Sequence, residues 1–149
     1  MMKTILMSIA LIVVSAVATA AEPMSPPAVS VTSPSPAGAA VYFIEPLDGA
    51  TVTPTFTVKF GLRGMGVAPA GTDVPNTGHH HLLIDVADLP DSKQPLPANE
   101  HILHFGKGQT ETQVTLTPGI HTLQLVFGNY LHIPHDPAVM SKPITVTVK

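Results

Sequence analysis

Histidine is the residue type in this sequence most able to do chemistry, and its distribution along the chain is uneven. Seven of the eight histidines lie in three short stretches, which are His79–His81, His101 with His104, and His132 with His135. The eighth, His121, stands apart, and the chain has no cysteine. Imidazole titrates near neutral pH and is the commonest metal ligand in proteins. The pattern therefore predicts a transition-metal site, provided that the stretches meet in space.

The rest of the sequence predicts strands joined by loops. Sixteen prolines and eleven glycines in 149 residues disfavour long helices. Short runs of alternating apolar residues, separated by turn residues, predict seven strands at 41–45, 51–60, 79–86, 100–105, 109–117, 120–127 and 144–149. We therefore expect an all-β, immunoglobulin-like antiparallel β-sandwich of about seven strands, with a small β-barrel as the alternative.

Such a sandwich would gather five histidines at one end. Successive antiparallel strands run in opposite directions, so that alternate loops lie at the same end. The candidate metal ligands placed there are His79, His81, His104, His132 and His135. His79 and His81 also share one face of a strand, with Cα atoms about 6.5 to 7 Å apart, which suits two ligands of one ion.

Ligand chemistry favours copper first and zinc second. Several imidazoles with few carboxylates suit copper, zinc or nickel better than magnesium or calcium. Met65 and Met140 are possible soft ligands, because both lie in loops expected at the same end, and a thioether would favour copper. Asp136 could orient the ring of His135 from outside the coordination shell.

The remaining histidines have simpler interpretations. His80 shares a strand face with Leu82 and Ile84, which predicts a buried and hydrogen-bonded ring. His121 and His101 alternate in phase with apolar neighbours, and we expect both of them in the core as well.

The amino terminus predicts export. Residues 1–20 have the positive start, apolar stretch and small-residue cleavage site of a signal peptide, so that we expect a periplasmic or secreted protein with no membrane span after cleavage. Residues 21–40 form a Pro/Ser/Ala-rich linker expected to be extended, and residues 41–149 form the domain. Without Lys3, six basic and ten acidic residues leave a net charge of −4 and no basic run, which argues against nucleic acid as a partner.

Four stretches resemble a known bacterial secreted family. They are the residues 78–85 (GHHHLLID), 104–111 (HFGKGQTE), 118–125 (PGIHTLQL) and 132–137 (HIPHDP), and residues 60–67 (FGLRGMGV) match in style. Together they are similar to the family catalogued as domain of unknown function 4399 (DUF4399). The resemblance implies an exported β-rich domain and marks the same histidines, but it implies no activity.

The leading hypothesis is a periplasmic copper- or zinc-binding carrier or buffer. The alternative is a metal-free cell-envelope module that binds a protein or a glycan. An enzyme is less favoured, because the chain has no thiol and no Gly-x-Ser-x-Gly motif, and only Asp73, Glu111 and Asp136 supply carboxylates near the expected site.

Overall fold

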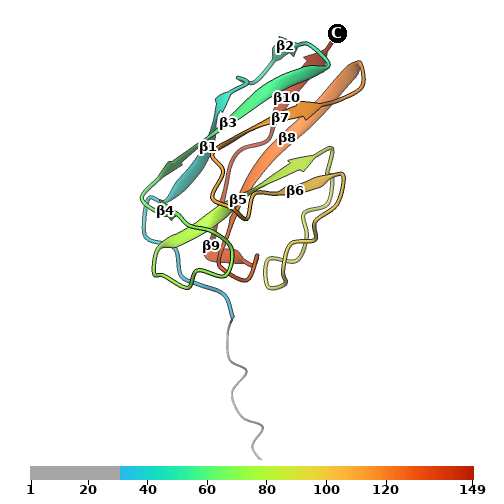
Figure 1. Cartoon of the computed structure of the whole chain (residues 1–149). Coiled ribbons are helices and arrows are strands. Elements are labelled where there is room, and N and C mark those ends of the chain that lie inside the picture. The colour runs from blue at the N-terminus through green and yellow to red at the C-terminus, as the bar shows by residue number, and fades with distance from the viewer. Residues whose placement is uncertain (1–30) are drawn as a thin grey trace, which may run out of the picture.

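The computed structural model describes residues 31–149, and these residues form ten strands and no helix (Figure 1). No helix in this part of the chain could therefore cross a membrane. The expected signal peptide at 1–20 and the first half of the expected linker, 21–30, lie outside the described residues.

The strands build two sheets. The smaller sheet has the order β1 (Ala40–Glu45), β3 (Thr55–Arg63) and β7 (Glu111–Thr115). The larger sheet has the order β2 (Ala50–Val52), β10 (Ile144–Val148), β8 (Gly119–Gly128), β5 (Thr77–Ile84) and β4 (Gly66–Val67). In addition, β6 (Ile102–His104) pairs with β5, and β9 (Pro134–Met140) pairs with β8. Neighbours are antiparallel except for β2 with β10 and β4 with β5.

The β-sandwich is thus confirmed, but with ten strands instead of about seven. The expected strand 51–60 is two strands, because the chain breaks at Thr53-Pro54 and passes from the larger sheet to the smaller one. Proline lacks the N–H group that a continuous ladder would need. The expected loop 128–143 contains β9, whose two prolines conceal the strand pattern and are tolerated at a sheet edge.

The larger sheet is buried on both faces where the histidines lie. Between the sheets, side chains such as Val58, Leu82 and Leu125 form the main core. A second cluster, Leu83, Leu96, Ile102 and Val126, contains only residues of the larger sheet and of the 85–101 loop, so it covers the outer face. As a result, every residue of β5 from Gly78 to Ile84 is buried.

The end of the expected linker packs against the domain. Pro34 forms a parallel bridge with Asp136, the Ser35 N–H donates to the Asp136 carbonyl (3.2 Å), and the Asp136 N–H donates to the Ser33 carbonyl (2.9 Å). Residues 33–35 therefore act as a short edge segment beside β9.

Two histidines expected in the core lie elsewhere. His101 is exposed, because β6 begins only at Ile102 and the strand alternation does not reach it. His121, at the start of β8, lies at the margin of the core, where its Nδ1 is 2.7 Å from Asp85 Oδ2 and its Nε2 is 2.9 Å from the Thr117 carbonyl. The hydrogen bond to Asp85 raises the pKa of His121, and the same contact lowers the pKa of Asp85 against its partial burial.

We predict that His121→Gln weakens the fold only within a pH window. A raised histidine pKa stabilises the fold below the unfolded value of 6.5, and this stabilisation is lost as pH rises through the folded value. The lowered Asp85 pKa keeps the carboxylate charged above 3.8. Because the Asp85 side chain is 38% exposed, the substitution should lower the free energy of unfolding by at most about 1 kcal/mol within this window. Urea unfolding of the wild type and of His121→Gln at pH 5.5 and pH 9 checks this prediction. An equal loss of unfolding free energy at the two pH values would contradict it.

Candidate metal centre

Four histidines meet on the outer face of the larger sheet. His79 and His81 come from β5, His104 ends β6, and His132 lies in the turn between β8 and β9. One ring nitrogen from each lies within 4.8 Å of the others. Antiparallel pairing explains much of this, since His81 is directly opposite His104, and His79 is opposite Gly128 at the end of β8. We call these four residues the histidine cluster.

His132 is held by a side chain that sequence reasoning missed. Asn129 is 1% exposed, and its Oδ1 accepts the N–H groups of Leu131 (2.9 Å) and Ile133 (3.1 Å), on either side of His132. Its Nδ2 donates to the Val31 carbonyl and to Ser33 Oγ. His132 itself has a positive φ of 67°, which such a turn must support. The one available sequence signal was Gly128-Asn129 after a strand, a pair typical of turns.

The 85–101 loop also holds this turn. The N–H of Leu96, whose side chain is buried in the outer cluster, donates to the His132 carbonyl at 2.9 Å. The main chain of one candidate ligand is therefore fixed by the same loop that covers the outer face of the sheet.

Two glycines make room for the rings. A Cβ atom at Gly128 would lie 2.8 Å from Cε1 of His81, and one at Gly106 would overlap the ring of His104. Neither position could carry a larger residue without moving a candidate ligand. These glycines therefore fix how closely the rings approach the backbone.

The cluster is buried and poor in hydrogen bonds. His79 and His81 are fully buried, whereas His104 and His132 are partly exposed. His79 Nε2 lies 3.1 Å from His132 Nδ1. Among buried ring nitrogens, His79 Nδ1, both nitrogens of His81 and His104 Nε2 have no partner. Buried polar groups in proteins are nearly always paired, so this concentration of unpaired nitrogens marks the four histidines as a candidate metal site.

Burial keeps these rings neutral. Desolvation, followed by the neighbouring imidazoles, lowers the pKa of His79 to about 4 and that of His81 to about 3. Desolvation and then His132 also lower the pKa of His104. Metal ions bind the neutral form of imidazole, so that at pH 7 these three rings are ready to bind an ion without losing a proton.

The spacing suits one small ion. Tetrahedral coordination with bonds of about 2.0–2.1 Å places neighbouring ligand atoms about 3.3 Å apart. His79 Nε2 and His132 Nδ1 are 3.1 Å apart, and the four candidate ligand atoms all lie within 4.8 Å of one another, so the rings would need to move inward to close on one ion.

His135 is not brought into the cluster. Its ring is buried against Phe127, with Nδ1 3.2 Å from the Phe127 carbonyl and Nε2 3.2 Å from the Thr77 carbonyl. Pairing of Pro134 with Gly128 starts β9 and turns His135 toward these carbonyls. The ring therefore lies between the Thr77 carbonyl of β5 and the Phe127 carbonyl of β8, and it links these two strands beside the cluster.

The other predicted site residues also lie outside the cluster. Met65 packs against the core between the sheets, and Met140 packs against the outer cluster. Asp136 is exposed, and its main chain pairs with residues 33–35. His80 is buried between Phe60 and Phe127 as predicted, with centroids 5.0 and 5.1 Å away, but neither ring nitrogen has the expected hydrogen bond.

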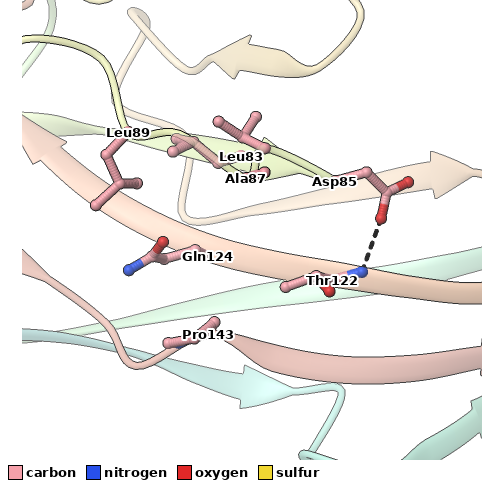
Figure 2. A pocket seen from close by; sticks show the side chains of 8 residues that line it. Leu83, Asp85, Ala87, Leu89, Thr122, Gln124 and Pro143 are labelled. Carbon is pink, nitrogen blue, oxygen red and sulfur yellow. Dashed lines mark hydrogen bonds between the residues drawn. The ribbon is translucent and has the colours of Figure 1, made fainter.

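A separate groove of about 600 Å³ lies near the other end of β5, outside the cluster (Figure 2). Its wall is mainly apolar, with Leu83, Leu89 and Pro143, and its polar groups include Gln124 and Asp85. Figure 2 shows Asp85 accepting the Thr122 N–H, at 2.8 Å. None of the four clustered histidines lines this groove.

Comparison with protein-family models identifies a family. A family model described as "Domain of unknown function (DUF4399)" matches residues 58–149, which include all four histidines of the cluster. Searches of curated proteins and of solved structures gave no match.

We predict that the metal-free protein loses stability steeply in mild acid. His79, His80 and His81 have pKa values of about 4, 4 and 3, against 6.5 when unfolded. Below pH 6.5 these histidines bind protons in the unfolded chain but not in the folded chain, so the free energy of unfolding decreases as the pH is lowered. Three such groups give a limiting slope of about 4 kcal/mol per pH unit near pH 5.

Urea unfolding at several pH values between 7 and 5, with a chelator present, measures this slope. His80→Leu is the control, because it removes one of the three groups without touching the cluster and should reduce the slope by about a third. It should also raise stability at pH 7 by about 1–3 kcal/mol, since an unpaired buried polar group is lost. A slope unchanged by this substitution would contradict the prediction.

We predict that Asn129→Ala weakens both the fold and the metal site. The substitution removes four hydrogen bonds of a buried amide, which should cost about 2–4 kcal/mol in unfolding free energy. His132 should lose its fixed position, and zinc affinity should fall. Calorimetric titration of the folded variant with zinc measures the second effect, and wild-type affinity in a destabilised variant would show that Asn129 does not position the ligand.

Proposed function

This chain belongs to the DUF4399 family, and we propose that it is a periplasmic or secreted protein that binds a transition-metal ion, copper or zinc, as a carrier or buffer. The ligands are the four residues of the histidine cluster, His79, His81, His104 and His132. His135, Met65 and Met140 are not among them.

The observation that carries this proposal is the set of unpaired, buried ring nitrogens. Leaving a buried polar group without a partner costs about 1–3 kcal/mol. Among the described residues, four such nitrogens belong to His79, His81 and His104, and each of these rings, with His132, offers one nitrogen to a group within 4.8 Å. A bound ion would give one nitrogen of each ring a strong partner, and binding would offset a cost that the apoprotein carries.

The ligand set favours binding over catalysis. Four protein ligands complete a tetrahedral shell, whereas catalytic zinc sites keep one position open for water or substrate. No carboxylate belongs to the group found among the described residues. His104 and His132 are partly exposed, so an ion would enter and leave past these two rings, where a protein partner from the cell envelope could receive it.

The groove of Figure 2 favours a second candidate function, an envelope module that binds a protein or a glycan. Leu89, on its rim, is 47% exposed, and apolar walls with a few polar groups are typical of binding sites. In that case Leu89→Ser would weaken capture of the partner, while removal of the histidines would not.

We predict that one equivalent of zinc or copper stabilises the protein and that His81→Leu abolishes the effect. A ligand at one hundred times its Kd stabilises the folded state by about 2.7 kcal/mol. His81→Leu should lower affinity by more than about 100-fold, because losing a mere supporting partner of a ligand already costs 10- to 100-fold. The metal-free variant should remain folded, since the replaced ring has no hydrogen-bond partner.

His101→Ala is the matched control, because His101 is an exposed histidine outside the cluster. It should keep the full metal-dependent shift in Tm. Thermal denaturation with and without metal, together with elemental analysis, gives both readouts. A wild-type Tm unchanged by excess zinc and by excess copper would reject the proposed function.

A further inference from the structure

We infer that the ion held by the histidine cluster is zinc and that the site selects it by shape. This inference rests on the proposed function and names its cargo. It comes from the arrangement of the four rings, from the lack of sulfur ligands in the cluster, and from the rigidity of the strands that carry the rings.

The four rings surround a point in three dimensions. The six distances between their centroids run from 4.5 Å, for His104 with His132, to 6.1 Å, for His81 with His132. For any four points in one plane, the longest distance is at least about 1.41 times the shortest, by plane geometry. Here the ratio is about 1.36, so the centroids cannot be coplanar. Cu(II) and Ni(II) prefer tetragonal or square-planar donors, whereas Zn(II) has no such preference and is bound tetrahedrally.

The donor atoms argue against Cu(I). Cu(I) is selected by soft thiolate and thioether ligands, and the chain has no cysteine. Both methionines considered as soft ligands are packed in hydrophobic clusters, Met65 between the sheets and Met140 on the outer face. Nitrogen alone remains, and imidazole is a good ligand for zinc.

The strands keep the cluster from flattening. His79 and His81 lie on β5, which is paired with β8 on one side and with β4 and β6 on the other. Gly106 and Gly128 hold the backbone close against the rings of His104 and His81. His132 lies in the turn that Asn129 and the N–H of Leu96 hold. Making the four rings coplanar would require a paired strand or this turn to shift, so the folded protein should resist a square-planar ion.

Cobalt(II) tests the shape, because its visible absorption is strong in tetrahedral sites and weak in octahedral ones. The metal-free full-length protein should give an intense visible spectrum with one equivalent of Co(II), and one equivalent of Zn(II) should remove it. His101→Ala should give the same spectrum, and His81→Leu should give none. A weak spectrum with stoichiometric cobalt would overturn the inference while leaving metal binding in place. Absence of bound cobalt and zinc in a protein that still binds copper would also overturn the inference, and absence of all three metals would reject the proposed function itself.

Competition tests the selectivity. An N-donor site free to rearrange binds Cu(II) more tightly than Zn(II). We expect the affinity ratio of Cu(II) to Zn(II) to be at least about tenfold smaller for the folded protein than for the same protein in urea, because only the folded chain imposes a shape. Equal amounts of Cu(I) and Zn(II), offered without oxygen, should leave at least about ten times more zinc than copper on the protein. The inference would be overturned if the Cu(II)-to-Zn(II) affinity ratio were the same for the folded protein and for the protein in urea. It would also be overturned if the protein retained as much Cu(I) as Zn(II), or more.

Discussion

The site depends on one strand, β5, being buried on both faces. A strand sends alternate side chains to opposite sides of its sheet. The three consecutive histidines of β5 therefore divide, with His80 entering the core between the sheets and His79 and His81 lying on the outer face. In most antiparallel sheets the outer face is wet, and rings placed there would be solvated and protonated in mild acid. Here Leu96 and its neighbours cover that face, and the pKa of the two outer rings falls far below neutrality.

Because the outer face is covered, the histidines that form the site lower the stability of the metal-free fold. Each buried imidazole without a partner lowers stability, and a packed apolar side chain in its place would raise it. The described chain nevertheless buries four unpaired ring nitrogens in the cluster, and a fifth and a sixth on His80 behind it. Departures of this kind from good packing are expected where residues serve function rather than folding. A single ion would pair one nitrogen of each ring in the cluster, but none of His80, which lies on the other side of the strand.

Strand patterns predicted much of this arrangement, and their errors have physical causes. The sandwich and the meeting of His79, His81, His104 and His132 follow from alternation and from antiparallel neighbours. The number of strands was wrong at Pro54, in 61–78, which contains β4, and in 128–143. The meeting survives, because it needs only the pairing of β5 with β6 and β8. His101 and His121 were misplaced because both lie at strand ends, where alternation no longer reports burial. His135 could not be separated from His132 by spacing, since the turn and the start of β9 decide which of the two faces the cluster.

The part of the site least visible in the sequence is the support of His132, and it joins distant parts of the chain. One buried amide, Asn129, binds the main chain on both sides of His132 and also binds Val31 and Ser33, almost one hundred residues earlier. From the other direction, the 85–101 loop holds the His132 carbonyl through the N–H of Leu96. No pattern of period two could reveal these contacts, because turns and loops made them. His79 and His81 are thus fixed by the sheet itself, while His132 is fixed by segments that border it. An ion bound by all four histidines would therefore tie the amino-terminal segment and the covering loop to the central strand, so that occupancy of the site and order at this end of the sandwich would rise and fall together.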